Sequence, residues 1–99
     1  MERTRKPSLP GEILKEMYLD PLGMTVTEFS VRIGVSRKTV SALIHGRASV
    51  TVDMSLRLSK ALGTTPDMWL NMQRAVDLWK ARQEKGSWTL VQPLVAQTA

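Results

Sequence analysis

The stretch that most constrains the fold is residues 25–46, where two helix-length amphipathic segments are separated by a single short turn. The first segment has its less polar residues at helical spacing: Val26, Phe29, Ser30 and Ile33. Thr25 and Glu28 match the pattern of a capping box, in which each side chain accepts a hydrogen bond from the other residue's backbone N–H. Gly34 can adopt the left-handed conformation that a sharp turn requires. These features predict a helix that begins after Thr25 and ends at Gly34.

The second segment begins two residues after that glycine. Ser36 is a typical helix N-cap, and Gly46 is placed to end the helix. Its inner face consists of apolar residues at helical spacing: Val40, Leu43 and Ile44. Ser30, four residues before the glycine, is small enough to let the two helices cross closely. Val35, Val40 and Leu43 are expected to pack the second helix against the first. The pattern therefore predicts a helix-turn-helix unit spanning about residues 25–46.

The outer face of the second helix carries residue types that suit the major groove of DNA: Arg37, Lys38, Ser41 and Ala42. The formal net charge of the chain is +5, and residues 32–52 contain Arg32, Arg37, Lys38 and Arg47 but no acidic residue. Positive potential of this kind raises the rate of encounter with phosphate. The alternative is an ordinary helical hairpin with a solvated basic face. The joint spacing favours DNA binding, with these four residues reading base edges.

A second set of residues is predicted to contact the DNA backbone. Hydroxyls at helix N-termini and cations beyond the second helix suit phosphate oxygens. This set comprises Thr25, Thr27, Ser36, Thr39, His45 and Arg47. For His45, capping of helix carbonyls is an equally open interpretation, and the cap role of Thr25 competes with a phosphate contact.

The rest of the chain predicts an all-α protein of five helices. The first helix begins at Pro10 and ends within residues 20–23, and the fourth is capped by Thr51. Thr65 and Pro66 mark the start of the fifth, which runs to about residue 84, with Gly86 after it. Its larger apolar residues favour a core position over a partner surface: Trp69, Met72 and Trp79.

Two terminal segments flank a domain predicted over residues 9–86. Residues 1–8 form a basic tail, either solvated or reaching the minor groove of DNA. Residues 87–99 are either a tail or a short strand that pairs between two chains, with Pro93 limiting the pairing. In the strand alternative, the dimer interface consists of Trp88, Leu90 and Leu94. The other candidate for a self-complementary dimer interface is the apolar side of the fifth helix.

Composition argues against several other functions. The chain contains no cysteine and one histidine, so we expect no metal site, no cofactor and no enzymatic activity. No apolar run approaches the roughly 18 residues of a membrane span, and the first residues lack the apolar stretch of a signal peptide. We therefore expect a cytoplasmic protein.

The chain resembles the HigA-type (VapI-like) antitoxins within the repressor family of helix-turn-helix proteins. The resemblance covers about residues 9–82 and rests on five stretches: 10–14 (PGEIL), 34–41 (GVSRKTVS), 46–47 (GR), 58–63 (LSKALG) and 66–73 (PDMWLNMQ). The last matches the pattern P-x-x-W-L-x-L-Q, with Met72 where leucine is usual. The resemblance implies a homodimer that represses its own operon and neutralises a small ribosome-dependent ribonuclease toxin of the HigB type. Two alternatives are a stand-alone regulator without a toxin and a protein-interaction module that no longer binds DNA.

Overall fold

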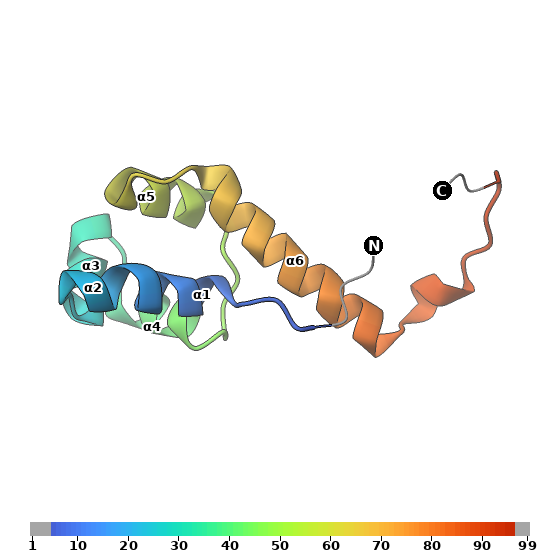
Figure 1. Cartoon of the computed structure of the whole chain (residues 1–99), viewed down its shortest axis with the longest axis horizontal. Coiled ribbons are helices and arrows are strands. Elements are labelled where there is room, and N and C mark those ends of the chain that lie inside the picture. Colours follow the sequence, from blue (N-terminus) through green and yellow to red (C-terminus); the bar gives the residue numbers. More distant parts are fainter. Residues whose placement is uncertain (1–4, 97–99) are drawn as a thin grey trace.

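The computed structural model describes residues 5–96, and every regular element within this range is helical. The elements are α1 (Pro10–Ile13), η1 (Leu14–Leu19), α2 (Asp20–Leu22), α3 (Val26–Ile33), α4 (Arg37–Ile44), α5 (Val52–Leu62), α6 (Pro66–Glu84) and η2 (Ser87–Leu90). Since α1, η1 and α2 form one continuous helical run, the main elements confirm the predicted all-α fold of five helices within the described residues (Figure 1).

The first helical run is interrupted by a widened turn. Between α1 and α2, the π-helical segment η1 ends with a hydrogen bond from the Asp20 N–H to the Lys15 carbonyl. Pro21 follows directly, and a proline ring has no N–H and would collide with the carbonyl four residues before it. The wider turn relieves that collision, so Pro21 accounts for the π-helical segment. Gly23 then ends the run with a φ of 62°.

The core lies where the first helical run, α3, α4 and α5 meet the first half of α6. Its fully or almost fully buried apolar side chains include Leu14, Phe29, Val40, Leu58 and Trp69. The Trp69 indole N–H donates to the Thr64 hydroxyl at 2.7 Å, and its ring lies 5.8 Å from that of Tyr18. Trp69 is therefore a core residue as predicted, whereas Met72 and Trp79 are half-buried.

The predicted helix starts are confirmed at all four hydroxyl caps. The side chains of Thr25, Ser36, Thr51 and Thr65 each accept a hydrogen bond from a backbone N–H in the first turn of the following helix. The predicted stop at Gly86 is wrong in detail. Lys85, with a φ of 50°, adopts the left-handed conformation at the end of α6, and Gly86 is extended.

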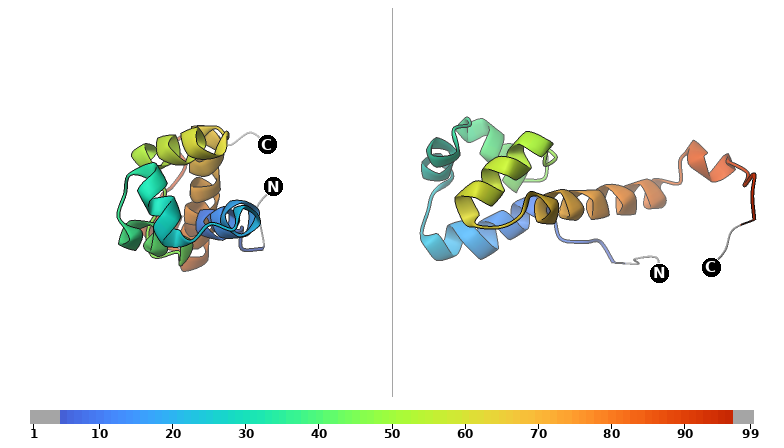
Figure 2. Two further views of the ribbon diagram at one scale, coloured as in Figure 1. Left: turned by 90° about the vertical axis from the view of Figure 1, so that its left-hand side faces the viewer. Right: turned by 90° about the horizontal axis from the view of Figure 1, so that it is seen from above.

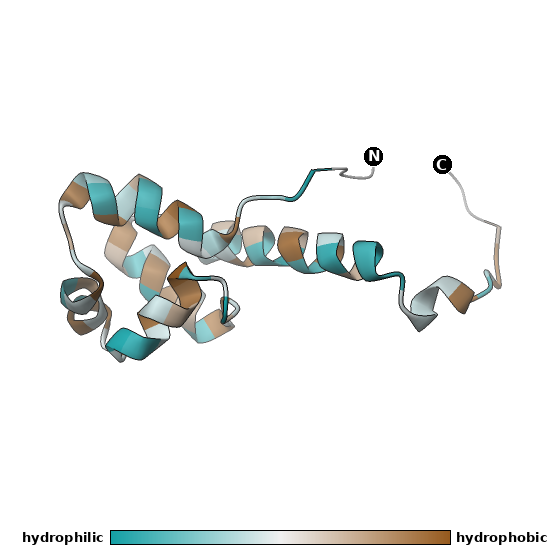
Figure 3. Cartoon of the chain, turned by 90° about the horizontal axis from the view of Figure 1, so that it is seen from below, coloured by the Kyte–Doolittle hydropathy of each residue, from teal (hydrophilic) through white to brown (hydrophobic). Residues whose placement is uncertain are grey.

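The second half of α6 extends beyond the other helices and makes the molecule elongated, with extents of 51 × 23 × 22 Å (Figures 1 and 2). Val76 is the last residue of α6 with a buried side chain. Beyond the helix, the C-terminal segment carries apolar residues that lie apart from the helical core (Figure 3).

The strand alternative for the C-terminal segment is not what the single chain adopts. Trp88 and Leu90 lie in the 3-10 helix η2, where Thr89 N–H donates to Gly86 O and Val91 N–H donates to Trp88 O. The Trp88 indole donates to the Ala81 carbonyl at 3.3 Å. A strand needs a neighbouring strand for its backbone groups, and residues 5–96 contain none, so local bonds form instead. Parts of the two predicted tails, residues 1–4 and 97–99, lie outside the described residues.

Candidate nucleic-acid interface

The turn between α3 and α4 is held by backbone hydrogen bonds and by one small side chain. Gly34 has a φ of 74°, and the Val35 N–H donates to the Ser30 carbonyl at 3.1 Å. Ser30 is buried, and its hydroxyl donates to the Thr27 carbonyl at 2.7 Å. A serine at the helix crossing is therefore accommodated without an unpaired polar group, and α4 has a defined position against α3.

The two faces of α4 differ sharply in burial. Val40, Leu43 and Ile44 are buried in the core. On the opposite side, Arg37 and Lys38 are exposed, and Ser41 and Ala42 are half-buried beside them. The structure thus brings the four predicted base-reading residues onto one accessible helix face.

Arg37 is oriented by a residue of the preceding helix. Its Nε–H donates to the Thr27 hydroxyl oxygen at 3.1 Å, which joins the starts of α4 and α3. Among the described residues, the two Nη groups of Arg37 make no hydrogen bond. A guanidinium held through Nε presents its remaining N–H groups outward, which suits bidentate contact with a guanine edge. The sequence pattern predicted a phosphate contact for Thr27 and did not indicate this pairing.

The capping residues are already partly engaged within the chain. At α3, the Thr25 N–H donates to the Glu28 carboxylate at 3.0 Å, and the Glu28 N–H donates to the Thr25 hydroxyl at 3.1 Å. The backbone N–H and the hydroxyl of Thr25 lower the pKa of Glu28 from its ordinary 4.5. A carboxylate here competes with phosphate, so Thr25 is the weakest phosphate candidate. At α4, the Ser36 and Thr39 hydroxyls lie 2.8 Å apart and are exposed.

His45 and Arg47 lie just after α4. The His45 Nδ1 lies 2.8 Å from the Ser41 carbonyl, an arrangement in which a protonated Nδ1 caps the helix and leaves Nε2 on the outside. This geometry matches the capping interpretation of His45. Arg47 is exposed in the loop of residues 46–49, and its backbone N–H donates to the Ala42 carbonyl at 2.8 Å.

Two residues that position α3 and α4 were not predicted. Gly11 in α1 lies against α4 so closely that an added Cβ would be 2.0 Å from the Leu43 carbonyl oxygen. Arg57 in α5 donates from Nη1 to the carbonyls of Ile33 and Gly34, at 2.8 and 3.4 Å, at the end of α3. Its pairing with Asp53 at i,i+4 spacing was visible in the sequence, but the distant carbonyls were not.

Residues 5–96 contain no cluster of three histidine, cysteine, aspartate or glutamate side chains that could hold a metal ion. None of the helices described has the length and apolar character needed to span a bilayer.

Comparison with known proteins identifies the family. Residues 14–69 match the helix-turn-helix family. The chain is 47% identical over 79 residues to YbaQ, an uncharacterised HTH-type transcriptional regulator of Escherichia coli K12, covering 80% of this chain and 70% of YbaQ. It is 46% identical over 78 residues to Antitoxin HigA-1 of Vibrio cholerae, covering 79% and 73% of the two chains. This chain belongs to the HigA-type family of helix-turn-helix proteins.

The three-dimensional structure agrees with the family assignment. The structure of antitoxin GraA in complex with its operator matches this chain with a TM-score of 0.85 and 40% identity, covering 97% of this chain and 99% of GraA. Members of this HigA-type family are DNA-binding regulators and antitoxins, which confirms the prediction that the chain is not an enzyme.

Proposed function

We propose that this HigA-type protein is a transcriptional repressor that binds an operator through α4 and acts as the antitoxin of a toxin–antitoxin module. The observation that carries the proposal is the outer face of α4, where Arg37 is held by Thr27 beside an exposed Lys38. GraA, which is similar over 97% of this chain, has been solved with its operator. Base reading is assigned to Arg37, Lys38, Ser41 and Ala42.

Backbone contacts are assigned to residues at both ends of α4. Ser36 and Thr39 present hydroxyls at the start of α4, and Arg47 presents a cation in the loop after α4, whereas the Thr27 hydroxyl is used by Arg37. His45 contributes through Nε2, since Nδ1 faces the Ser41 carbonyl. Such contacts hold the protein on the duplex without specifying its sequence.

A homodimer is part of the proposal. One helix-turn-helix unit covers few base pairs, and proteins of this kind bind two half-sites about 34 Å apart. The exposed apolar side chains of the C-terminal segment support an interface there: Leu90 is 75% exposed and Leu94 is 99% exposed. Together with Trp88, these residues remain the proposed dimer contact, although they do not form a strand in the single chain.

The toxin partner is proposed from similarity to Antitoxin HigA-1, and a small ribonuclease of the HigB type is the expected partner. A second function, a stand-alone regulator, is supported by the equal similarity to YbaQ, described as a transcriptional regulator. Co-expression with the product of an adjacent gene separates the two. Stable co-purification and relief of growth arrest support the antitoxin, and neither is expected of a stand-alone regulator.

The DNA-binding proposal is tested by titrating wild type and Arg37→Ala against the protein's own promoter and a duplex with one mismatched operator position. Loss of a bidentate arginine contact costs roughly 1–3 kcal/mol on the matched operator and much less on the mismatched one. Lys60→Ala, which removes an exposed charge outside residues 32–52, is the matched control. Equal loss on both duplexes would show that Arg37 contacts only phosphate.

A further inference from the structure

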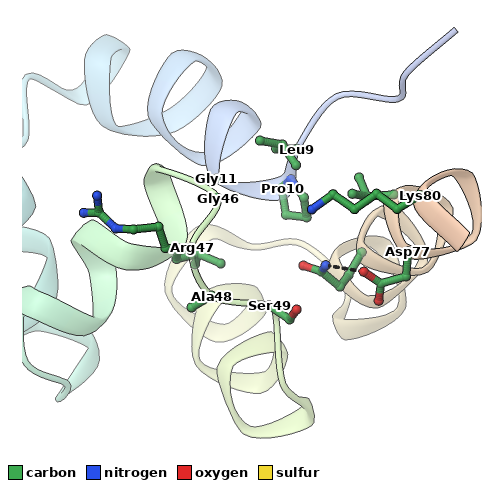
Figure 4. A pocket seen from close by; sticks show the side chains of 12 residues that line it. Leu9, Pro10, Gly11, Gly46, Arg47, Ala48, Ser49, Asp77 and Lys80 are labelled. Atoms are coloured by element: carbon green, nitrogen blue, oxygen red, sulfur yellow. Dashed lines mark hydrogen bonds between the residues drawn. The ribbon is translucent and has the colours of Figure 1, made fainter. Parts of the chain in front are cut away.

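Gln73 in α6 connects that helix to the loop that carries Arg47. Its Oε1 accepts a hydrogen bond from the Val50 N–H at 2.9 Å, across 23 residues of sequence. Its Nε2 donates to the Asp77 carboxylate at 3.0 Å, the contact drawn as a dashed line in Figure 4. The Asp77 carboxylate can accept a hydrogen bond but cannot donate one. It therefore pairs with the Gln73 NH2 group and leaves the amide oxygen facing Val50.

The loop of residues 46–49 is held mainly at its two ends. At its start, the Ala42 carbonyl in α4 accepts the N–H groups of Arg47 and Ala48, at 2.8 and 3.2 Å. At the end of the loop, the side chain of Val50 is buried. Without Gln73, the Val50 N–H would have no hydrogen-bond partner. An unpaired buried N–H is costly, so the Gln73 contact constrains where the loop ends.

Packing beneath the loop is incomplete, although Gly46 lies close to the Leu9 side chain. A cavity of about 180 Å³ lies between the loop, the start of α1 and α6, and its lining includes Gly46, Ser49, Gln73 and Lys80. Figure 4 shows the Arg47 side chain extending away from Asp77 on α6. Since the cavity leaves part of the inner side of the loop without close contacts, the hydrogen bonds at its ends carry much of the constraint.

We propose that Gln73 is a positioning residue for DNA binding: it holds the loop of residues 46–49 where Arg47 meets a backbone phosphate, without touching DNA itself. The inference rests on the proposed function. The hydrogen bonds to Val50 and Asp77 give Gln73, the last residue of the stretch 66–73, a positioning role within the chain. It also ties α6 directly to the DNA-facing side of the molecule.

The test compares Gln73→Leu, Arg47→Ala and the double variant, with Gln83→Leu, an exposed glutamine on the same helix, as control. Operator affinity is measured over a range of salt concentrations. Arg47→Ala should lower the slope of log K against log salt by about one unit, the value for one phosphate contact. Gln73→Leu should lower it by a similar amount, equally on matched and mismatched operators. The double variant should lose no more than Arg47→Ala alone.

Amide hydrogen exchange gives a readout that does not depend on DNA. Exchange at Val50 should accelerate in Gln73→Leu and stay at the wild-type rate in Gln83→Leu. If Gln73→Leu fails to fold, Asp77→Ala replaces it, because it removes only the orienting carboxylate from an exposed position and should give a smaller loss of the same kind.

The outcomes separate this inference from the proposed function. Wild-type affinity and salt slope in Gln73→Leu, or losses that add to those of Arg47→Ala, overturn the positioning role alone. A wild-type protein that binds no promoter DNA overturns the proposed function, whatever the exchange rate at Val50.

Discussion

At the residue scale, the chemistry of the candidate interface depends on pairs of side chains. The Arg37 guanidinium is oriented by a hydroxyl from α3, and the start of α3 is stabilised by the reciprocal bonds of Thr25 and Glu28. In each pair, one short polar side chain restricts a longer charged one. Such restriction lowers the entropy lost when the charged group binds, which makes an exposed arginine a more specific reader.

Thr27→Val tests the orientation of Arg37. Valine keeps the shape of threonine but cannot accept the Arg37 Nε–H, so the affinity for the matched operator should fall by about 0.5–1.5 kcal/mol, the usual net value of one hydrogen bond. The measurement is an equilibrium titration with matched and mismatched duplexes. In an Arg37→Ala background the effect should vanish. A persistent loss there, equal on both duplexes, would assign Thr27 to phosphate instead.

Glu28→Gln tests the capping box through pH. The folded state lowers the pKa of Glu28 below 4.5, so the ionised carboxylate stabilises the fold above that pH and the contribution disappears as pH falls through the lowered pKa. The stability advantage of wild type over Glu28→Gln should therefore be constant at neutral pH and shrink in acid. Urea unfolding at a series of pH values measures it, with Glu16→Gln, an exposed position in η1, as control. An advantage that grows in acid would contradict the assignment.

At the element scale, α4 is positioned by three other helices. α1 crosses it at Gly11, α3 meets it across the Gly34 turn, and α6 reaches the loop that follows it through Gln73. α5 supports the arrangement from behind, where Arg57 satisfies carbonyls at the end of α3. The helix that presents the proposed base-reading residues is therefore fixed from several sides.

Gly11→Ala tests the crossing of α1 and α4. The added Cβ would lie 2.0 Å from a backbone oxygen and 2.7 Å from the Ile44 Cα, so the helices must move apart. We expect a loss of about 1–3 kcal/mol or more of folding stability, measured by urea unfolding. Gly86→Ala is the matched control, because its Cβ would make only an ordinary contact at 3.7 Å and its φ is negative. Equal stabilities of the two variants would contradict the close crossing.

At the scale of the whole molecule, the helical core and the projecting half of α6 differ in how much apolar surface they expose. The core is closed and presents α4, whereas the far end of α6 and the segment after it expose several large apolar residues: Leu78, Trp88, Leu90, Val91, Leu94 and Val95. Apolar exposure of this extent on a small chain favours association. The shape of the single chain is therefore consistent with the proposed two-fold dimer.

Truncation after Gly86 tests the C-terminal contact. Removing Trp88, Leu90 and Leu94 should shift the protein towards monomer in sedimentation and lower its operator affinity, because two linked half-site contacts become one. A chain that ends at Ala96 is the control. A truncated protein that remains dimeric with full affinity would place the interface on the helical surface of α6.

Much of this fold could be predicted from the sequence because its signals are local. The caps at Thr25, Ser36, Thr51 and Thr65 form bonds within three residues, and apolar spacing alone indicated which faces of α3 and α4 are buried. Placement of the proposed base-reading residues on the outer face of α4 followed from the same periodicity. Interactions with such short separation depend on the residue pattern and little on the rest of the chain.

The tertiary structure decided which distant residues meet. Nothing in the spacing of Thr27 and Arg37, or of Gln73 and Val50, indicates a contact, because each pair depends on how two helices cross. The closeness of Gly11 to α4 arises in the same way. The alternation around Trp88 was as compatible with a strand as with a tail. A strand, however, exists only where a neighbouring strand pairs with its backbone groups. Within residues 5–96 there is none, and the segment forms a 3-10 helix instead.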